Sequence, residues 1–331
     1  MVRGREQRGS ARRGPLLAAL VIGLGLVAAP AIFQMFSRAP KGGDMITEFR
    51  PYMTKAEISK FQRYIREIDA ADAESGKRLP PLMQQRLGLD AAAVHQRYPG
   101  YAAFNQRWKV INADMGDMLA TMHGDIDNFE AVDALPPFPL FPWFFVVPGL
   151  LVAGFAAWGL VQTRRGRSGR GARIAVIVLG LGVVAAPAMF QMFTRAPKGA
   201  EMIDDFRPFM TTKKVRTIQG YFRTIGEGEG DLRVGVFGAL ETEGRVPASQ
   251  LEAQLPATER FSRAWPTMFA DFGQMIGTMT DNVDNYQAVD ALPPFTLFPW
   301  FFVVPGLLIA GSGFAARPSD HSALRRSQEE P

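Results

Sequence analysis

Apolar residues along this chain gather in four runs that lack a charged side chain, at 15–36, 140–161, 174–193 and 297–316. A helix needs roughly 20 apolar residues to cross the hydrocarbon layer of a membrane. Each run is long enough, so the pattern predicts four transmembrane helices. The first run also fits a cleavable signal peptide, because a basic leader precedes it. We favour a retained helix, since the similar run at 174–193 lies in mid-chain, where a signal peptide cannot act.

The segments between the runs show helical periodicity. Apolar residues recur at steps of three and four at Ile58, Phe61, Ile65 and Ile68, and again at Val215, Ile218, Phe222 and Ile225. This spacing places them on one face of a helix. Thr54 and Glu57 form a capping box at the start of the first of these helices. The second lacks the box, because Lys214 replaces the Glu.

Two longer helices are predicted after Pro99 and Pro256. Their apolar stripes are Phe104, Trp108, Ile111, Met115, Met118 and Met122 in the first half, and Phe261, Trp265, Met268, Phe272, Met275 and Met279 in the second. Such spacing is typical of a packing seam. Thioethers can bind copper(I), but no His or Cys joins the stripe, so we favour a core. A shorter helix is predicted at Asp90–Gln96 with Asp90 as N-cap, and a short strand at Leu232–Phe237.

The two halves of the chain repeat each other at a spacing of 157 residues. Residues 133–151 read DALPPFPLFPWFFVVPGLL and residues 290–308 read DALPPFTLFPWFFVVPGLL. Self-similarity at a fixed spacing indicates a repeat architecture. The predicted fold is therefore an all-α integral membrane protein with four spans. It is a tandem duplication of one unit, made of a transmembrane helix, a small helical-bundle extracytoplasmic domain and a second transmembrane helix.

Charge predicts the orientation, since positive residues near the ends of spans favour the cytoplasmic side. The leader carries five arginines against one glutamate, and the linker between the halves carries five arginines and no acid. The predicted segments are a basic cytoplasmic leader (1–14), transmembrane helix 1 (15–36), extracytoplasmic domain 1 (37–139), transmembrane helix 2 (140–161), an Arg-rich cytoplasmic linker (162–173), transmembrane helix 3 (174–193), extracytoplasmic domain 2 (194–296), transmembrane helix 4 (297–316) and a cytoplasmic tail (317–331). The sequence pI of 9.6 reflects these arginines. We attribute them to topology and anionic lipid heads rather than to nucleic-acid binding.

Prolines crowd the stretch from Asp133 to Pro142. Proline removes a backbone donor and disfavours helix at the residue before it, so this stretch is predicted to be a non-helical collar. Aromatic rings favour the membrane–water interface. The predicted interface belt consists of Phe141, Trp143, Phe144, Phe298, Trp300 and Phe301.

Oxygen ligands that could hold a hard cation such as calcium form an acidic strip. The candidates are Asp125, Asp127, Asp133, Asp281, Asp284 and Asp290. The EF-hand spacing is missing, so we favour a solvated acidic face and predict no metal or cofactor. The chain has no cysteine, which excludes disulfides and thiol chemistry. His95, His123 and His321 do not recur between the halves, and common nucleotide, hydrolase and metalloprotease motifs are missing. We therefore predict a protein that is not an enzyme.

Small residues and sequence divergence give two further expectations. Gly25 with Ala29, and Gly182 with Ala186, are small-xxx-small pairs that let helices approach closely, although this motif is frequent by chance in spans rich in Ala and Gly. The halves differ most at 67–85 and 224–242, where Ser75 and Glu229 are expected at exposed tips.

These observations favour a non-enzymatic, multi-pass envelope membrane protein. Its paired helical outer domains would bind a protein, lipid or wall partner as a scaffold or accessory subunit. One alternative is a component of a transporter or channel built on parallel repeats. The other is a membrane sensor that needs a separate output partner. The expected location is the plasma (inner) membrane with both termini cytoplasmic. The expected partners are membrane lipid and either another protein or further copies of the chain, without nucleic acid.

Overall fold

The computed structural model of the protein describes residues 3–167 and 169–316. The chain is 87% helical, with no strand in that part of it, which confirms the predicted all-α class. Its contacts define two units. Among the described residues, the span unit comprises 3–44, 131–201 and 288–316, and the bundle unit comprises 45–130 and 202–287. The expected tail at 317–331, which includes His321, lies outside the described residues.

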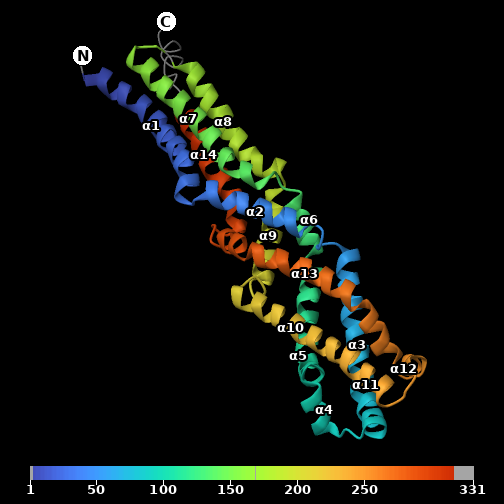
Figure 1. Ribbon diagram of the computed structural model, residues 1–331. Coiled ribbons are helices and arrows are strands. Elements are labelled where there is room, and N and C mark those ends of the chain that lie inside the picture. The colour runs from blue at the N-terminus through green and yellow to red at the C-terminus, as the bar shows by residue number, and fades with distance from the viewer. Residues whose placement is uncertain (1–2, 168, 317–331) are drawn as a thin grey trace. The chain divides into compact units, whose positions relative to one another are not determined.

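Corresponding helical segments follow the same order in both halves, although some that form one helix in one half are divided in the other (Figure 1). The span unit contains α1 (Arg3–Ile32), η1 (Phe138–Leu140), α7 (Phe141–Arg164), α8 (Arg170–Met189), η3 (Phe295–Leu297) and α14 (Phe298–Ala315). The bundle unit contains α3 (Lys55–Leu87), α4 (Ala91–Arg97), α5 (Pro99–Gly124), α10 (Thr212–Gly230), the π-helix η2 (Asp231–Val236), α11 (Phe237–Thr242) and α12 (Ala248–Gln254). Residues of α2 (Met35–Phe49), α6 (Ile126–Asp133), α9 (Met192–Phe206) and α13 (Pro256–Asp290) belong to both units.

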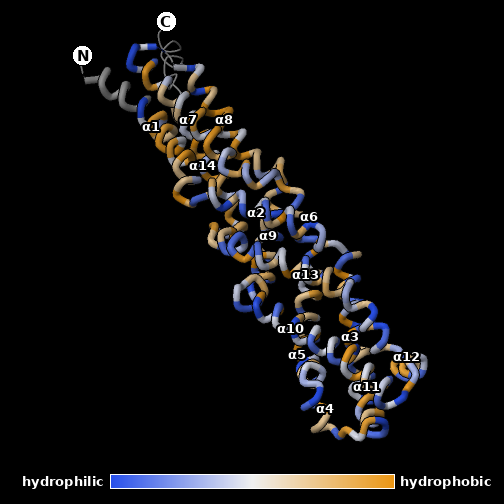
Figure 2. The backbone as a smooth tube through the Cα atoms, in the orientation of Figure 1, coloured by the Kyte–Doolittle hydropathy of each residue, from blue (hydrophilic) through white to orange (hydrophobic). Residues whose placement is uncertain are grey.

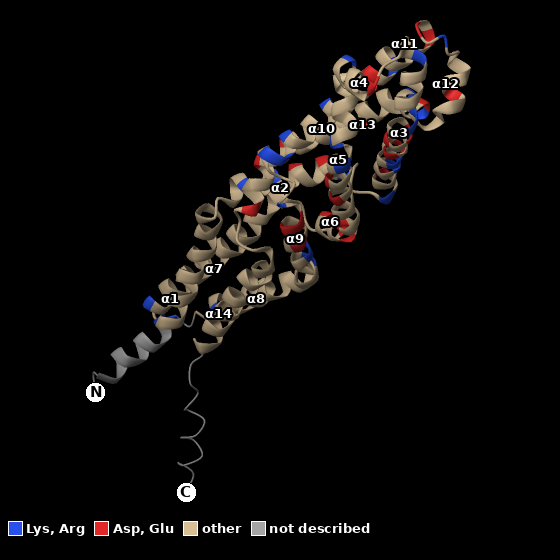
Figure 3. Cartoon of the chain, turned by 90° about the horizontal axis from the view of Figure 1, so that it is seen from below, with Lys and Arg blue, Asp and Glu red and all other residues tan. Residues whose placement is uncertain are grey.

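Within the described part of the chain, four helices are long and apolar enough to cross a membrane, as predicted. The candidate spans are Arg13–Ile32, Phe138–Arg164, Arg170–Met189 and Phe295–Ala315. Hydrophobic residues dominate them in Figure 2, and Figure 3 shows few charged residues along α7, α8 and α14. Spans 1 and 3 end earlier than expected. Gln34 and Gln191 have φ angles of 54° and 53°, and this left-handed conformation interrupts a helix.

Glycines bring the span helices into backbone contact within each half. A Cβ atom added at Gly23 would lie 2.9 Å from the carbonyl oxygen of Gly149, and one at Gly180 would lie 2.8 Å from that of Gly306. Small residues allow this approach of two helices in a membrane. Helix α1 therefore packs closely on α7, and α8 packs closely on α14. Contacts of α7 with α8 and of α1 with α14 join the two pairs.

The close contacts do not involve the small-xxx-small glycines that the sequence suggested. A Cβ atom at Gly25 or Gly182 would meet nothing within 4 Å. Two residues along a helix correspond to a rotation of about 200°, so these glycines point away from the helix that Gly23 or Gly180 contacts. These two motifs therefore do not mediate close packing between the described helices.

The predicted apolar faces and stripes of the bundle unit are buried. The faces of α3 and α10 and the stripes of α5 and α13 all lie in its core. Thr54 accepts a hydrogen bond from the backbone N–H of Glu57 at 3.2 Å, and Thr211 accepts one from that of Lys214 at 3.1 Å. The second helix is thus capped although it lacks the Glu of the box. Asp90 caps α4 as predicted, accepting from the N–H of Ala93.

The two segments expected as separate outer domains share one compact unit. Tyr64 on α3 donates to Asp271 on α13 at 2.8 Å. The equivalent pair, with the halves exchanged, is Tyr221 on α10, which donates to Asp114 on α5. Hydrogen bonds from Lys214 and Tyr221 lower the pKa of Asp114. Each half therefore binds the long helix of the other.

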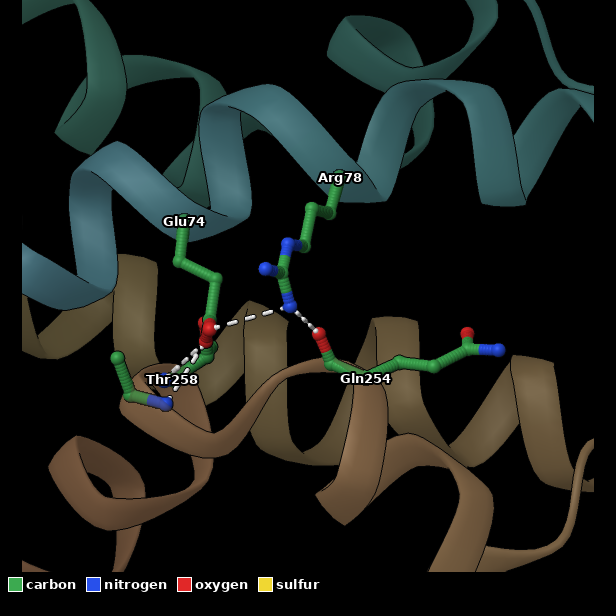
Figure 4. Close-up of polar contacts among 5 residues, drawn as sticks. Glu74, Arg78, Gln254 and Thr258 are labelled. Carbon is green, nitrogen blue, oxygen red and sulfur yellow. Dashed lines mark hydrogen bonds and ion pairs between the residues drawn. The ribbon is translucent and has the colours of Figure 1, made fainter.

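Helix capping repeats this exchange between halves. Glu74 on α3 accepts hydrogen bonds from the backbone N–H groups of Ala257 and Thr258, at 2.8 and 2.9 Å, at the start of α13 (Figure 4). Asp231 lies 157 positions after Glu74 and accepts from the N–H of Gly100 at 2.7 Å at the start of α5. A carboxylate at a helix N-terminus satisfies orphan donors and interacts favourably with the helix dipole.

The segment Leu232–Phe237, expected to be a strand, is helical. Leu232 and Val236 are buried, whereas Val234 between them is 66% exposed. Buried residues four apart belong to one helix face, so the apparent alternation was misleading. The expected collar at Asp133–Pro142 is also shorter, because 134–137 are non-helical while η1 and α7 follow directly. Proline is favourable in the first turn of a helix, where its missing N–H costs nothing.

The positions expected at exposed tips are also buried. Ser75 is 0% exposed and Glu229 is 4% exposed. The sequence difference between the halves therefore does not mark the solvent side.

A buried carboxyl group makes the stability of the bundle unit depend on pH. Burial, with a contribution from Asp69, raises the pKa of Asp72 to about 7. The folded state then holds a proton that the unfolded chain releases above about pH 4, so stability falls as pH rises from about 4 to 7. Asp72→Asn keeps an acceptor for Asn105, which donates to Asp72 at 2.8 Å. We expect this variant to be stabilised at pH 8 and unchanged at pH 4, measured by thermal unfolding with exposed Asp117→Asn as control. An equal effect at both pH values would contradict the prediction.

Candidate functional site

Two apolar grooves lie in the span unit, each between helices of different halves. The first, between α1 and α14, has a volume of about 260 Å³, and the second, between α7 and α8, about 450 Å³. The first is lined by Ile22, Gly25, Leu26, Ala29, Phe33, Met35, Phe145, Pro293, Phe298, Phe301 and Pro305. The second is lined by Pro136, Leu140, Phe141, Trp143, Phe144, Val147, Pro148, Leu179, Gly182, Val183, Ala186, Phe190, Met192 and Phe302. Volumes of this order are typical of small-ligand sites.

The grooves are two copies of one site. Every residue that lines the first groove has a counterpart 157 positions away that lines the second. Phe145 and Phe302 form the wall between the grooves, with ring centroids 4.4 Å apart. Phe141 and Phe298 form a second pair at 6.3 Å. Each ring in these pairs is the counterpart of its partner.

Small residues open both grooves toward the helix backbone. Gly25 and Gly182 lie on the lining, and the space beside their Cα atoms is free to at least 4 Å. Ala29 and Ala186 follow one turn later on the same face. Larger side chains at these positions would occupy the grooves.

The structure divides the predicted aromatic belt between groove walls and exposed rings. Phe141 and Phe298 are buried, while Phe144 and Phe301 are partly exposed and line the second and first groove. The exposed residues are Trp143 and Trp300, at 51% and 52%. These are the exposed amphipathic rings expected at a membrane–water interface.

A tight turn at the end of each span positions a basic residue. The carbonyl oxygen of Gln34 accepts hydrogen bonds from the Ser37 hydroxyl and the Arg38 N–H, both at 3.0 Å. The carbonyl of Gln191 likewise accepts from Thr194 and Arg195. Helices α2 and α9 therefore start immediately after the span.

The basic residue reaches a carbonyl group next to the groove. Nη1 of Arg38 donates to the carbonyl oxygen of Ala291 at 2.7 Å, and Nη1 of Arg195 donates to that of Ala134 at 2.6 Å. Two residues after each carbonyl stands a proline of the groove lining, Pro293 or Pro136. One end of each apolar groove therefore lies near a guanidinium group.

A small apolar cavity in the bundle unit is also formed by equivalent residues. It measures about 40 Å³ and is lined by Met45, Ile46, Phe49, Met53 and Phe129 with Met202, Ile203, Phe206, Met210 and Tyr286. This volume leaves room for only a few atoms, since one water needs about 10–15 Å³. The methionines of the predicted stripes are not in its lining; they lie buried in the core.

The structure does not collect the acidic strip into a metal site. Asp127, Asp281 and Asp284 are exposed, whereas Asp125 is buried and accepts a hydrogen bond from Asn128 at 2.8 Å. At the position equivalent to Asp125, Asn282 is buried and donates to Glu48 at 2.6 Å. Across residues 3–167 and 169–316, no three His, Cys, Asp or Glu side chains are placed to hold a metal ion.

Sequence reasoning missed most of the groove lining and both arginines. The available signal was their retention in both halves, because Gly25, Arg38 and their counterparts fall within the strongly repeated stretch 23–54 and 180–211. The repeat alone could not show that they line a groove, since the groove forms only where helices of different halves meet.

Comparison of the chain with protein-family models, with curated proteins and with solved structures found no match. The geometry of the grooves is therefore the basis for a functional proposal.

Proposed function

We propose that this chain is a non-enzymatic, multi-pass protein of a plasma (inner) membrane that binds the hydrocarbon chains of lipids in its two grooves. In this proposal the bundle unit lies outside the cytoplasm and acts as a scaffold or accessory subunit. The halves arose by tandem duplication of a span–bundle–span unit. The observation that carries the proposal is the pair of grooves, in which every residue of the first lining is matched in the second.

Physical chemistry supports a hydrocarbon occupant. The grooves are lined by aliphatic, aromatic, proline and small residues, in helices that are long and apolar enough to cross a membrane. A lipid chain in such a groove replaces bilayer contacts with matched packing against a fixed surface, which is the main source of association inside a membrane. The arginine-rich linker supports the orientation. Labelling of Val234→Cys with an impermeant maleimide in intact cells tests it, because Val234 is 66% exposed.

Filling the grooves tests lipid binding. We expect the double variant Gly25→Leu and Gly182→Leu to lose most lipid retained after extensive detergent washing, because each new side chain enters the groove. The matched control is Gly154→Leu with Gly311→Leu, which adds the same side chains in spans where a Cβ atom also meets nothing within 4 Å. Neither residue of this control lines a groove. The readout is the amount and kind of lipid per chain by native mass spectrometry, together with cross-linking to a diazirine fatty acid.

Equal lipid retention in the filled and control variants would show that the lipid is ordinary annular lipid, and would reject the proposal. A component of a lipid transporter is the second candidate, because parallel repeats are common in transporters. It would be favoured if reconstituted wild-type protein moved a fluorescent lipid between leaflets and the filled variant did not.

A further inference from the structure

We propose that each groove binds one phospholipid, whose phosphate is held by Arg38 at the first groove and by Arg195 at the second. This inference rests on the proposed function, since it names the class of lipid that the grooves select. Its basis is the placement of a guanidinium group near one end of each apolar groove.

Each arginine is held by hydrogen bonds at its backbone and at its guanidinium group. Its backbone N–H is bonded to the carbonyl of the preceding left-handed glutamine, at 3.0 Å in both halves. Its Nη1 is held at 2.7 Å by Ala291 in the case of Arg38 and at 2.6 Å by Ala134 in the case of Arg195. A guanidinium held in one orientation loses less conformational entropy when it binds a ligand.

The fixed orientation leaves donors for an anion. A guanidinium has five N–H donors, and its planar fork fits phosphate oxygens in bidentate fashion. One of the five is directed to the carbonyl. Both arginines are partly buried, and a charged hydrogen bond is stronger there than in bulk water because the local dielectric constant is lower.

A second positive charge stands beside each arginine. Lys41 follows Arg38 by three residues in α2, and Lys198 follows Arg195 by three residues in α9. Residues three apart on a helix are neighbours on its surface. Acidic residues lie near this pair in the sequence as well, Asp44 and Asp290 in the first case and Glu201 and Asp133 in the second. Each groove end therefore has two basic side chains on one helix, of which the guanidinium is the one fixed next to the groove.

The combination of features selects among membrane lipids. A fatty acid or diacylglycerol would satisfy the apolar lining and leave the guanidinium without an anionic partner, whereas a soluble phosphate would use only the guanidinium. A phospholipid satisfies both, with its chain in the groove and its phosphate at the end where the span meets α2 or α9. The proposal commits to this occupant.

The test compares two lipids that share their chains. The full-length protein is reconstituted in nanodiscs that contain photoactivatable phosphatidylglycerol or photoactivatable diacylglycerol with identical acyl chains, and cross-linked lipid is quantified by mass spectrometry. We expect wild-type protein to prefer the phospholipid. In Arg38→Gln with Arg195→Gln the preference falls by roughly tenfold to hundredfold, as expected for losing a charge-assisted hydrogen bond at each site. Lysine at both positions should restore part of it, because charge returns without the planar fork.

The matched control is Arg13→Gln with Arg170→Gln. These arginines are also 157 positions apart, and both are exposed. They lie at the opposite ends of the first and third candidate spans, and their removal should leave the preference unchanged. Thermal unfolding of each variant shows whether the arginines act only through their hydrogen bonds to the carbonyl groups of Ala291 and Ala134. A purely structural role would lower stability without changing the ratio of the two lipids.

The outcomes separate the two proposals. An unchanged lipid ratio in the arginine double variant would overturn the headgroup assignment while leaving chain binding intact. Full competition by soluble glycerol phosphate would overturn the choice of a phospholipid as occupant, because the acyl chain would then contribute nothing to binding. Cross-linking of neither lipid in the grooves of wild-type protein would overturn the proposed function itself.

Discussion

Replacing Gly180 with alanine should loosen the second pair of span helices and lower the stability of the span unit by about 1–3 kcal/mol. The new Cβ atom would lie 2.6 Å from the backbone nitrogen of Ala310 and 2.8 Å from the carbonyl oxygen of Gly306. Backbone atoms cannot rotate away as a side chain can, so α8 and α14 must move apart. Their separation exposes the other packed atoms along the same seam. The measurement is the midpoint of unfolding in a titration with sodium dodecyl sulfate, followed by circular dichroism.

The control for this prediction stands two residues away on the same helix. Gly182→Ala adds the same methyl group, but its Cβ atom would meet nothing within 4 Å. It should unfold like the wild-type protein, apart from the small gain that alanine gives over glycine in a helix. Gly23→Ala should be less harmful than Gly180→Ala, because its closest backbone atoms are 2.9 Å away. If Gly180→Ala and Gly182→Ala behave alike, the backbone contact between α8 and α14 does not exist.

Replacing Phe272 with alanine should destabilise the bundle unit by about 3–5 kcal/mol, the usual cost of removing a buried phenylalanine ring. The side chain is fully buried. Its ring centroid lies 4.8 Å from that of Phe61 in the first half and 4.7 Å from that of Phe222 in the second. The resulting cavity would therefore weaken both halves at once. Hydrogen exchange of the full chain, read by mass spectrometry, measures the loss in each helix.

Phe269 provides the control one turn earlier on α13. Its ring is 52% exposed, and Phe269→Ala should change stability by no more than about 0.5 kcal/mol. The pattern of exchange carries the sharper test. Faster exchange in both α3 and α10 is expected of a shared core. Faster exchange in α10 alone would mean that each half folds around its own helices.

These experiments and those on the grooves address different units of one chain. The glycine and phenylalanine variants test how the halves are joined, whereas filled grooves and altered arginines test what they bind. Because Gly25 and Gly182 line the grooves without supporting a helix contact, their leucine variants can remove binding without the damage expected at Gly180. This separation lets a loss of lipid be assigned to the groove.

Much of the fold follows from the sequence, because the properties involved are local. Length and apolar content predict the four candidate spans, since the hydrocarbon thickness sets a fixed requirement. Steps of three and four predict the buried faces of α3, α5, α10 and α13, since a helix turns every 3.6 residues. Thr54 and Asp90 predict helix starts, since a cap needs only a nearby N–H group. The sequence also singles out Phe141 and Phe298, but as rings of the interface belt, whereas in the structure they line the grooves.

Tertiary structure decided what each of these faces meets. The two halves present nearly the same apolar faces, so periodicity cannot tell whether Phe61 packs on its own long helix or on that of the other half. The rotation of a span decides whether Gly23 or Gly25 meets the neighbouring helix. The carboxylates Glu74 and Asp231 cap helices through backbone N–H groups that lie 183 and 131 residues away along the chain. The grooves and the hydrogen bonds of their arginines also form only between residues of different halves. No local sequence pattern shows which residues of the two halves will be in contact.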